Sequence, residues 1–289
     1  MMILMKKNSK LRQTLRVFVA RGIVSKVALV IVILFFAVAL FAPLLTPYNP
    51  TDNSLLDRFQ GPSAKHWFGT DGLGRDILTR VLFGARVSML ASFGSSLLAA
   101  CIGILLGLSA GYFGKFYGAM IMRITDAMLS IPPMILILTI AMFFTNGIVG
   151  VVISVGISLM PTYIRMVYGL VLSIRENDYI VASKLIGQSG TNILLKHLLP
   201  NCVPTIIVMF TMNLGTAIML ESTLSYLGIG IKPPIATWGG MVSEGFQYIQ
   251  RAPHAAIIPG VCMILVIIAF NIVGDSLRDA LDPKLRGKL

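Results

Sequence analysis

The sequence predicts an all-α membrane protein with six transmembrane helices. Hydrophobic residues make up 56% of the 289 residues and charged residues only 12%, and the mean hydropathy is +0.83. Unlike an average soluble protein, such a chain cannot cover its apolar surface with polar groups. Its apolar runs are about as long as the roughly 20 residues with which a helix crosses a bilayer. Because no polar stretch is long enough to form a soluble domain, we expect the whole chain to be built around membrane helices.

The basic residues that precede the first apolar run are not accompanied by any acid. They are Lys6, Lys7, Lys10, Arg12, Arg16, Arg21 and Lys26. By the positive-inside rule, this excess predicts that residues 1–26 form a basic cytoplasmic tail. The net charge of +12 could also indicate nucleic-acid binding. The basic residues do not cluster with aromatic residues on one face, however, so no nucleic-acid partner is expected.

The first span is expected at residues 27–45, which carry no charge. This run is too long for a signal peptide and lacks a small-residue cleavage site, so we interpret it as a retained anchor. Pro43, Pro47 and Pro50 end the span and begin an extended segment. Because the tail is placed inside, the polar residues 46–85 are expected to form an extracytoplasmic segment.

Residues 86–275 are expected to form a core of five further helices. A short basic turn at residues 114–123 separates the second span from the third, and small residues recur in the second span, which predicts close helix packing. The expected spans are 87–112, 126–144, 148–172, 205–227 and 255–273. Residues 276–289 then form a cytoplasmic C-terminal tail.

Charged residues at the span edges support this topology. Asp126 is expected to cap its helix or pair with Arg123, and Arg165 is expected to extend its charge toward the inner membrane surface. Six spans place both termini in the cytoplasm, together with most of the 24 Lys and Arg residues. A five-span model would weaken this bias, so six spans are preferred.

A polar loop at residues 173–204 separates the fourth span from the fifth. Apolar residues first recur in it at helical spacing, and Gly187 and Gly190 then break the pattern. A second short helical piece at residues 192–199 is expected to end at Pro200, which cannot continue a helix. A helix, a glycine break, a second helix and a proline stop predict a compact projection that suits docking into a partner protein.

A cluster of chemically active residues in the extracytoplasmic segment allows two interpretations. His66, Asp71 and Asp76 could be a metal-ligand set. Alternatively, the glycines make tight turns, the acids cap the following helix and Arg75 pairs with a carboxylate, and we favour this second interpretation. The cysteines Cys101, Cys202 and Cys262 form no CxxC pair, so no metal site or disulfide framework is indicated.

The fifth span contains Asn213 and Glu221, and Glu221 is the acid that falls well within a span. An ionisable group at that depth is a functional-site hypothesis. The alternative is a buried structural acid that is hydrogen-bonded to Ser222, Thr223 or Ser225. The sequence favours neither, so Asn213, Glu221 and Ser222 are candidates for the translocation pathway.

The loop at residues 173–204 resembles the docking loop in permease subunits of ATP-binding-cassette importers. That loop reads E-A-A, three residues, G, nine residues, a hydrophobic residue, any residue and then L-P. Here Val181-Ala182-Ser183 stand at the E-A-A positions, with Val181 in place of the acid and Ser183 in place of an alanine. The resemblance implies that the residues coupling this chain to an ATPase are Asp178, Val181, Ala182, Ser183, Gly187, Leu199 and Pro200.

Three further strings resemble one subgroup, the dipeptide, oligopeptide and nickel importers. Residues 66–86 are similar to H-x-L-G-T-D-x-x-G-R-D followed by Y-G-A-R, and residues 221–239 to E-x-x-L-S-F-L-G-L-G-x-x-P-P-x-x-x-W-G. Residues 274–286 are similar to G-D-x-L-R-D-x-L-D-P-[KR]-L-R. The motif positions for which structural roles are expected are Gly69, Thr70, Asp71, Gly74, Arg75, Asp76, Pro233, Pro234 and Trp238.

The resemblance covers residues 42–286 and implies a C-type permease with the type I importer fold in a bacterial inner membrane. It implies a homologous second permease, two cytoplasmic ATPase subunits and an extracytoplasmic substrate-binding lipoprotein as partners. Because no G-x-x-x-x-G-K-[ST] loop occurs in the chain, ATP and Mg²⁺ are expected on the ATPase subunits, and no cofactor on this one. Expected substrates are short peptides, nickel or metal chelates, including opine-type metallophores. The alternatives are an ion-coupled secondary transporter that uses Glu221 and Asp126, or a structural membrane subunit.

Overall fold

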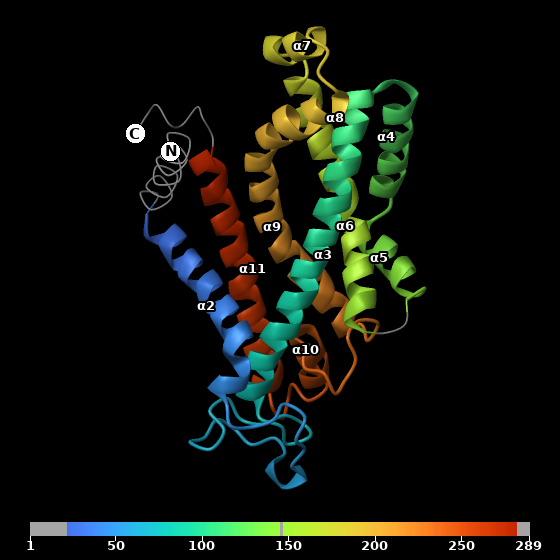
Figure 1. Cartoon of the computed structure of the whole chain (residues 1–289). Helices are drawn as coiled ribbons and strands as arrows, with labels where there is room; N and C mark the ends of the chain where they lie inside the picture. The colour runs from blue at the N-terminus through green and yellow to red at the C-terminus, as the bar shows by residue number, and fades with distance from the viewer. Residues whose placement is uncertain (1–21, 145–146, 282–289) are drawn as a thin grey trace.

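The computed structural model describes residues 22–144 and 147–281. Residues 1–21 of the expected basic tail, Thr145 and Asn146 of the expected outer turn, and residues 282–289 of the C-terminal tail lie outside the described residues. Within the described part the regular elements are helices (Figure 1). In chain order they are α2 (Ile23–Leu45), η1 (Leu55–Asp57), α3 (Ile77–Phe113), α4 (Lys115–Ser130), α5 (Pro133–Ala141), α6 (Ile148–Ile174), α7 (Asp178–Leu185), α8 (Gly190–Ile193), η2 (Leu194–Leu198), α9 (Leu199–Tyr226), α10 (Trp238–Phe246) and α11 (His254–Leu281).

The number of membrane helices agrees with the expected fold class. In the described part, 5 helical segments are long and apolar enough to cross a membrane, and the pair α4–α5 makes 6 if its two halves count as one span. The 5 segments are α2, α3, α6, the run Gly190–Tyr226 and α11. The all-α membrane fold predicted from composition is confirmed.

Several helices extend beyond the expected spans. α2 begins at Ile23, α3 begins at Ile77 within the expected extracytoplasmic segment, and α11 continues to Leu281 within the expected C-terminal tail. α3 begins early because the Asp76 carboxylate accepts a hydrogen bond from the backbone N–H of Thr79 at 2.7 Å and caps the helix.

The third span is not the continuous helix expected over residues 126–144. α4 and α5 meet at an angle of 97°. Ile131 between them has an extended backbone, with φ −87° and ψ 129°, because the proline that follows disfavours the helical conformation. The expected basic turn at residues 114–123 is also helical, because the chain turns at Gly114 and Lys115, with φ values of 56° and 49°, and α4 begins at Lys115.

The pairing expected for Asp126 is also different. The carboxylate of Asp126 pairs with the guanidinium of Arg165 and not with that of Arg123. α4 packs against α6, so the two charges come from neighbouring helices. Both side chains are half exposed, and Arg165 therefore has a charged partner in addition to the membrane surface.

α3 lies at the centre of the bundle, where it contacts α6, α9 and α2. α2 and α11 lie side by side, and α4 and α5 cover the flank of α6 (Figure 1). α7 projects from one end of the bundle, and the start of α2 and the end of α11 lie toward that same end. α10 and residues 46–76 lie at the opposite end (Figure 1).

Glycines bring α3 and α6 into close contact. Gly103, Gly107 and Gly111 lie along one side of α3, and each faces the backbone or the Cβ of a residue on α6. A Cβ on Gly107 would lie 2.8 Å from the carbonyl oxygen of Ile164 and 2.8 Å from the Cβ of Val167. In lipid, where burial does not drive helices together, such close backbone packing supplies much of the association energy.

Gly107→Ala is expected to lower the free energy of unfolding by about 1–3 kcal/mol, because the added methyl group would force the two helices apart. The matched control is Gly169→Ala on α6, where a Cβ would meet no atom within 4 Å. Thermal unfolding of the two purified variants in the same detergent measures the difference. Equal midpoints would contradict the close packing of α3 on α6.

Candidate functional site

The loop between α6 and α9 carries the projecting helix α7 (Figure 1). Asp178 lies in the first turn of α7 and Lys184 in the last, so both charges interact favourably with the helix dipole. The helix ends before Gly187, which has a φ of +79° and donates its N–H to the carbonyl of Lys184 at 3.0 Å. Glycine reaches this left-handed conformation without strain, so the expected break at Gly187 is a helix C-terminal cap.

One face of α7 is buried and the other is exposed. Ile180 and Ser183 are buried, and Ile180 belongs to an apolar cluster that includes Val171 of α6 and Leu198 of η2. Leu185 is 83% exposed and Ile186 is 80% exposed. The other exposed side chains of α7 include Asp178, Tyr179, Val181 and Ala182. Large apolar side chains exposed together on a projection indicate a contact surface for a partner.

Pro200 does not end a helix, contrary to expectation. α8, η2 and α9 form one helical run, and Pro200 lies in the first turn of α9. η2 is a π-helical turn in which the N–H of Leu199 bonds to the carbonyl of Leu194, five residues earlier. This wider turn accommodates a proline that a regular helix interior would not. The loop between α6 and α9 is therefore continuous with α9 through Leu199 and Pro200.

His197 stands where the docking motif has a hydrophobic residue. Its Nε2 lies 3.1 Å from Oε1 of Gln188, which joins the two halves of the loop. The loop also contacts α3, because Arg175 donates from Nη1 to the carbonyl of Gly111 at 3.0 Å and Lys184 lies over the ring of Tyr112 at 5.4 Å. These contacts attach the loop to the central helix of the bundle.

A second group of motif residues lies at the opposite end of the bundle. Gly69 and Gly74 have φ values of +76° and +75°, as tight turns require, and Thr70 accepts a hydrogen bond from the N–H of Gln60. Asp76 caps α3 and also lies 2.9 Å from Nδ1 of His66. Within residues 22–144 and 147–281, no group of three or more His, Cys, Asp or Glu side chains is placed to hold a metal. The turns and the helix cap of the interpretation that we favoured are present.

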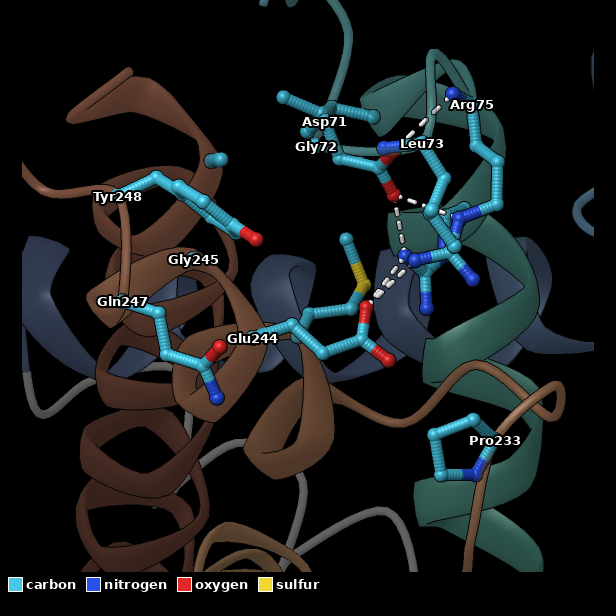
Figure 2. Close-up of a pocket in the computed structure, with 13 residues that line it drawn as sticks. Asp71, Gly72, Leu73, Arg75, Pro233, Glu244, Gly245, Gln247 and Tyr248 are labelled. Carbon is cyan, nitrogen blue, oxygen red and sulfur yellow. Dashed lines mark hydrogen bonds and ion pairs between the residues drawn. The ribbon is translucent and has the colours of Figure 1, made fainter. Parts of the chain in front are cut away.

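Asp71 is the centre of a buried charge network (Figure 2). Its carboxylate accepts from the backbone N–H groups of Leu73 and Arg75, from Nε of Arg75 at 2.7 Å and from Nη1 of Arg80. Glu244 of α10 completes the network, because its Oε2 accepts from Arg75 at 2.6 Å and from Arg80 at 2.8 Å. The expected pairing of Arg75 with a carboxylate is present.

The network shifts the pKa of Asp71. Burial raises this pKa, but the nearby guanidiniums of Arg80 and Arg75 outweigh burial and hold it below its ordinary value. Sequence analysis missed Arg80 and Glu244. Arg80 could have been noticed as an arginine next to the second predicted span, whereas Glu244 is 164 residues away from Arg80 and has no local signal.

The remaining motif residues join α10 to α3. Trp238 is buried and donates from Nε1 to the carbonyl of Val81 on α3 at 3.0 Å. Pro233 and Pro234 lie in the loop between α9 and α10 and are joined by a cis peptide bond. The hydrogen bond of Trp238 places α10 against the start of α3.

Glu221 is fully buried within the bundle. Its carboxylate accepts hydrogen bonds from Ser225 at 2.9 Å and Ser222 at 3.3 Å, whereas Thr223 donates to a backbone carbonyl instead. Two of the three expected hydroxyl partners of a structural acid are thus present. Asn213 lies two turns earlier on α9, and among the described residues its side-chain nitrogen has no hydrogen-bond partner.

A multi-pass helical bundle that presents a short helix with exposed apolar side chains beyond one end is a membrane protein with a surface suited to a partner. A family model described as "Binding-protein-dependent transport system inner membrane component" matches residues 103–287. A model for the N-terminal transmembrane domain of oligopeptide transport permease C matches residues 21–62.

The sequence is similar to named permeases. It is 42% identical over 260 residues to the dipeptide transport system permease protein DppC of Alkalihalophilus pseudofirmus, covering 90% of this chain and 86% of that one. It is 41% identical over 261 residues to the glutathione transport system permease protein GsiD of Escherichia coli O157:H7, with the same coverage of 90% and 86%. The chain belongs to the C-type permeases of the peptide ATP-binding-cassette importer family.

The fold is similar to that of an inward-facing MetNI methionine ABC transporter. The TM-score is 0.57 at 21% sequence identity, covering 71% of this chain and 96% of that one. The expected type I importer permease fold is confirmed, and the chain is a transport subunit and not an enzyme. The alternative of a secondary transporter is not favoured by these comparisons.

Asp71→Asn is expected to lower the free energy of unfolding by about 3 kcal/mol, because it breaks a buried ion pair and leaves Arg75 and Arg80 to share the single carboxylate of Glu244. Asp52→Asn removes the same charge from an exposed position at the same end of the bundle and is the matched control. Chemical unfolding of both purified variants at pH 7 measures the effect.

The pH dependence gives this prediction a second test. The pKa of Asp71 is lower in the folded protein than the ordinary 3.8, so its stabilisation is present above about pH 4 and is lost as pH falls through the folded-state value. The stability difference between wild type and Asp71→Asn should therefore shrink below pH 4. A difference that stays constant during acidification would contradict the role given to this carboxylate.

Proposed function

We propose that this chain is a permease subunit of an ATP-driven importer of short peptides, of about the size of dipeptides and glutathione. The observation that carries the proposal is the 42% identity with a permease named for dipeptide transport, over 90% of the chain. The relative at 41% identity is named for glutathione transport, and glutathione is also a short peptide. We therefore favour peptides over nickel or metal chelates, such as opine-type metallophores, as the cargo.

The proposed assembly has this chain paired with a homologous second permease in the cytoplasmic membrane of a bacterium. Two cytoplasmic ATPase subunits bind ATP and Mg²⁺, and a substrate-binding protein delivers the peptide from outside. We place α7 and both termini in the cytoplasm. The basic N-terminal residues support this orientation, and so does the position of the start of α2 and the end of α11 toward the α7 end (Figure 1).

Coupling in this proposal begins at the exposed face of α7. Leu185, Ile186 and the neighbouring Val181 and Ala182 contact the ATPase, while the buried Ile180 and Ser183 hold α7 against the bundle. When the ATPases close, they push α7, and the apolar cluster beneath it passes the displacement to α6 and α9. The cavity between the two permeases then faces outward and inward in turn, by alternating access. Asn213, Glu221 and Ser222 stay candidates for its lining on α9.

Uptake by a reconstituted importer tests the function. Proteoliposomes that hold both permeases and both ATPases are expected to accumulate a labelled dipeptide only with the binding protein outside and ATP inside. Excess unlabelled glutathione and excess nickel are added in separate experiments as competitors. Glutathione is expected to reduce uptake of the labelled dipeptide more strongly than nickel does. Accumulation by this chain alone, without ATP, would overturn the proposal.

Leu185→Glu is expected to reduce both co-purification of the ATPases and ATP-driven uptake by at least about tenfold, because a charge is costly where an apolar side chain is desolvated by a partner. The control is Leu56→Glu, at a leucine that is 97% exposed at the opposite end of the bundle. Full ATPase binding by Leu185→Glu would show that α7 is not the docking helix.

A further inference from the structure

A cavity of about 280 Å³ lies at the end of the bundle opposite α7, between the turn at residues 71–75, the start of α3, α10 and the start of α11 (Figure 2). Its charged lining residues are Asp71, Arg75, Arg80 and Glu244. The apolar residues lining it include Leu73, Ile77, Met241 and Ala255. Tyr248 and Glu244 project into the space that Asp71 and Leu73 face (Figure 2). The cavity thus combines a charged wall with an apolar wall.

The two carboxylates in the charged wall are held very differently. Asp71 accepts from two backbone N–H groups as well as from both guanidiniums, and its side chain is 9% exposed. Among the described residues, Glu244 accepts only from the guanidiniums of Arg75 and Arg80, and its side chain is 30% exposed. Asp71 is therefore a fixed partner of the two arginines, and Glu244 is a replaceable one.

Arg80 also has unused hydrogen-bonding capacity. Nε of Arg80 has no hydrogen-bond partner among the described residues, and the Arg80 side chain is buried, with only 2% of it exposed. A buried donor without a partner is costly, so a ligand that supplied an acceptor would gain energy there. With Glu244 turned away, Arg75, Arg80 and Asp71 together carry one net positive charge, which matches one carboxylate.

We propose that this cavity binds the carboxylate of a small solute on Arg75 and Arg80, in the place that Glu244 occupies in this structure. Arginine binds carboxylates well because its planar guanidinium offers several donors at fixed geometry. The volume lies just below the range of about 300–1,000 Å³ typical of drug-sized ligands, which suits an amino acid or a dipeptide. Taking the carboxylate to be the C-terminus of a transported peptide rests on the proposed function.

Binding of an acid and its amide by the wild-type importer is the first test. The purified complex of both permeases and both ATPases, without binding protein, is titrated with N-acetyl-alanyl-alanine and with its C-terminal amide. The acid is expected to bind at least about tenfold more tightly, the ratio for loss of a charge-assisted hydrogen bond. Equal affinities would overturn the proposal, and this comparison needs no variant to fold.

Glu244→Gln is the second test, because it removes the competing carboxylate and keeps the side-chain shape. The variant is expected to bind the acid about tenfold more tightly than wild type, whereas Asp52→Asn, the exposed control at the same end, leaves the affinity unchanged. Weaker binding by Glu244→Gln would show that Glu244 recognises the ligand itself, and it would overturn displacement.

Uptake in proteoliposomes separates this inference from the proposed function. If the importer takes up the dipeptide but its complex binds acid and amide equally, the inference fails and the function stands. If uptake is absent but the acid still binds selectively, the carboxylate site stands and the proposed function fails. If the binding protein binds to the complex through Arg75 and Arg80 and the free acid does not compete with it, the two arginines recognise a protein side chain. That result would overturn the proposal.

Discussion

The close packing of α3 on α6 is the constraint on which the rest of the structure depends. α3 has 37 residues and is therefore about 55 Å long, well beyond the roughly 30 Å of the hydrocarbon layer. Its glycines contact α6, so the two helices share backbone contacts and not only flexible side chains. α3 also reaches both functional ends, since Arg80 lies in the charge network and Gly111 contacts the docking loop. A displacement at one end is thus applied to a stiff element that extends to the other.

The helical run from Gly190 to Tyr226 gives the docking loop a second rigid connection. A helix that stopped at Pro200 would leave a hinge between the loop and α9. Because a π turn precedes the proline, the chain enters α9 without a break, and the buried Leu198 and Cys202 lie in the same apolar cluster as Ile180 of α7. In the coupling that we propose, α7 therefore acts on α6 through packing and on α9 through a continuous helical backbone.

Local signals in the sequence predicted most of the elements but not their partners. Apolar length predicted the spans other than the third, and Asp76 predicted a cap, because both depend on a few neighbouring residues. The motif spacing likewise predicted the family. Arg165 was missed as the partner of Asp126 because Arg123 is nearer in sequence, and only the packing of α4 on α6 selects the other arginine. The angle between α4 and α5 was not predictable either, since Pro132-Pro133 permits a bend whose size is set by packing against α6.

The candidate sites show the same division between local and distant information. Asp71 and Arg75 belong to one short motif, so their pairing could be expected, whereas Glu244 reaches them from α10 through the folding of the whole chain. The location of this network is physically necessary. Four charges would be very costly in hydrocarbon, but at the end of the bundle the two buried guanidiniums are paired with Asp71 and with the partly exposed Glu244. The middle of α3 is held against α6 by close glycine packing, and separating the two helices there would lose these contacts. Polar contacts therefore lie at the two ends of α3 and close glycine packing lies between them, so in the coupling that we propose α3 moves as one stiff element with α6.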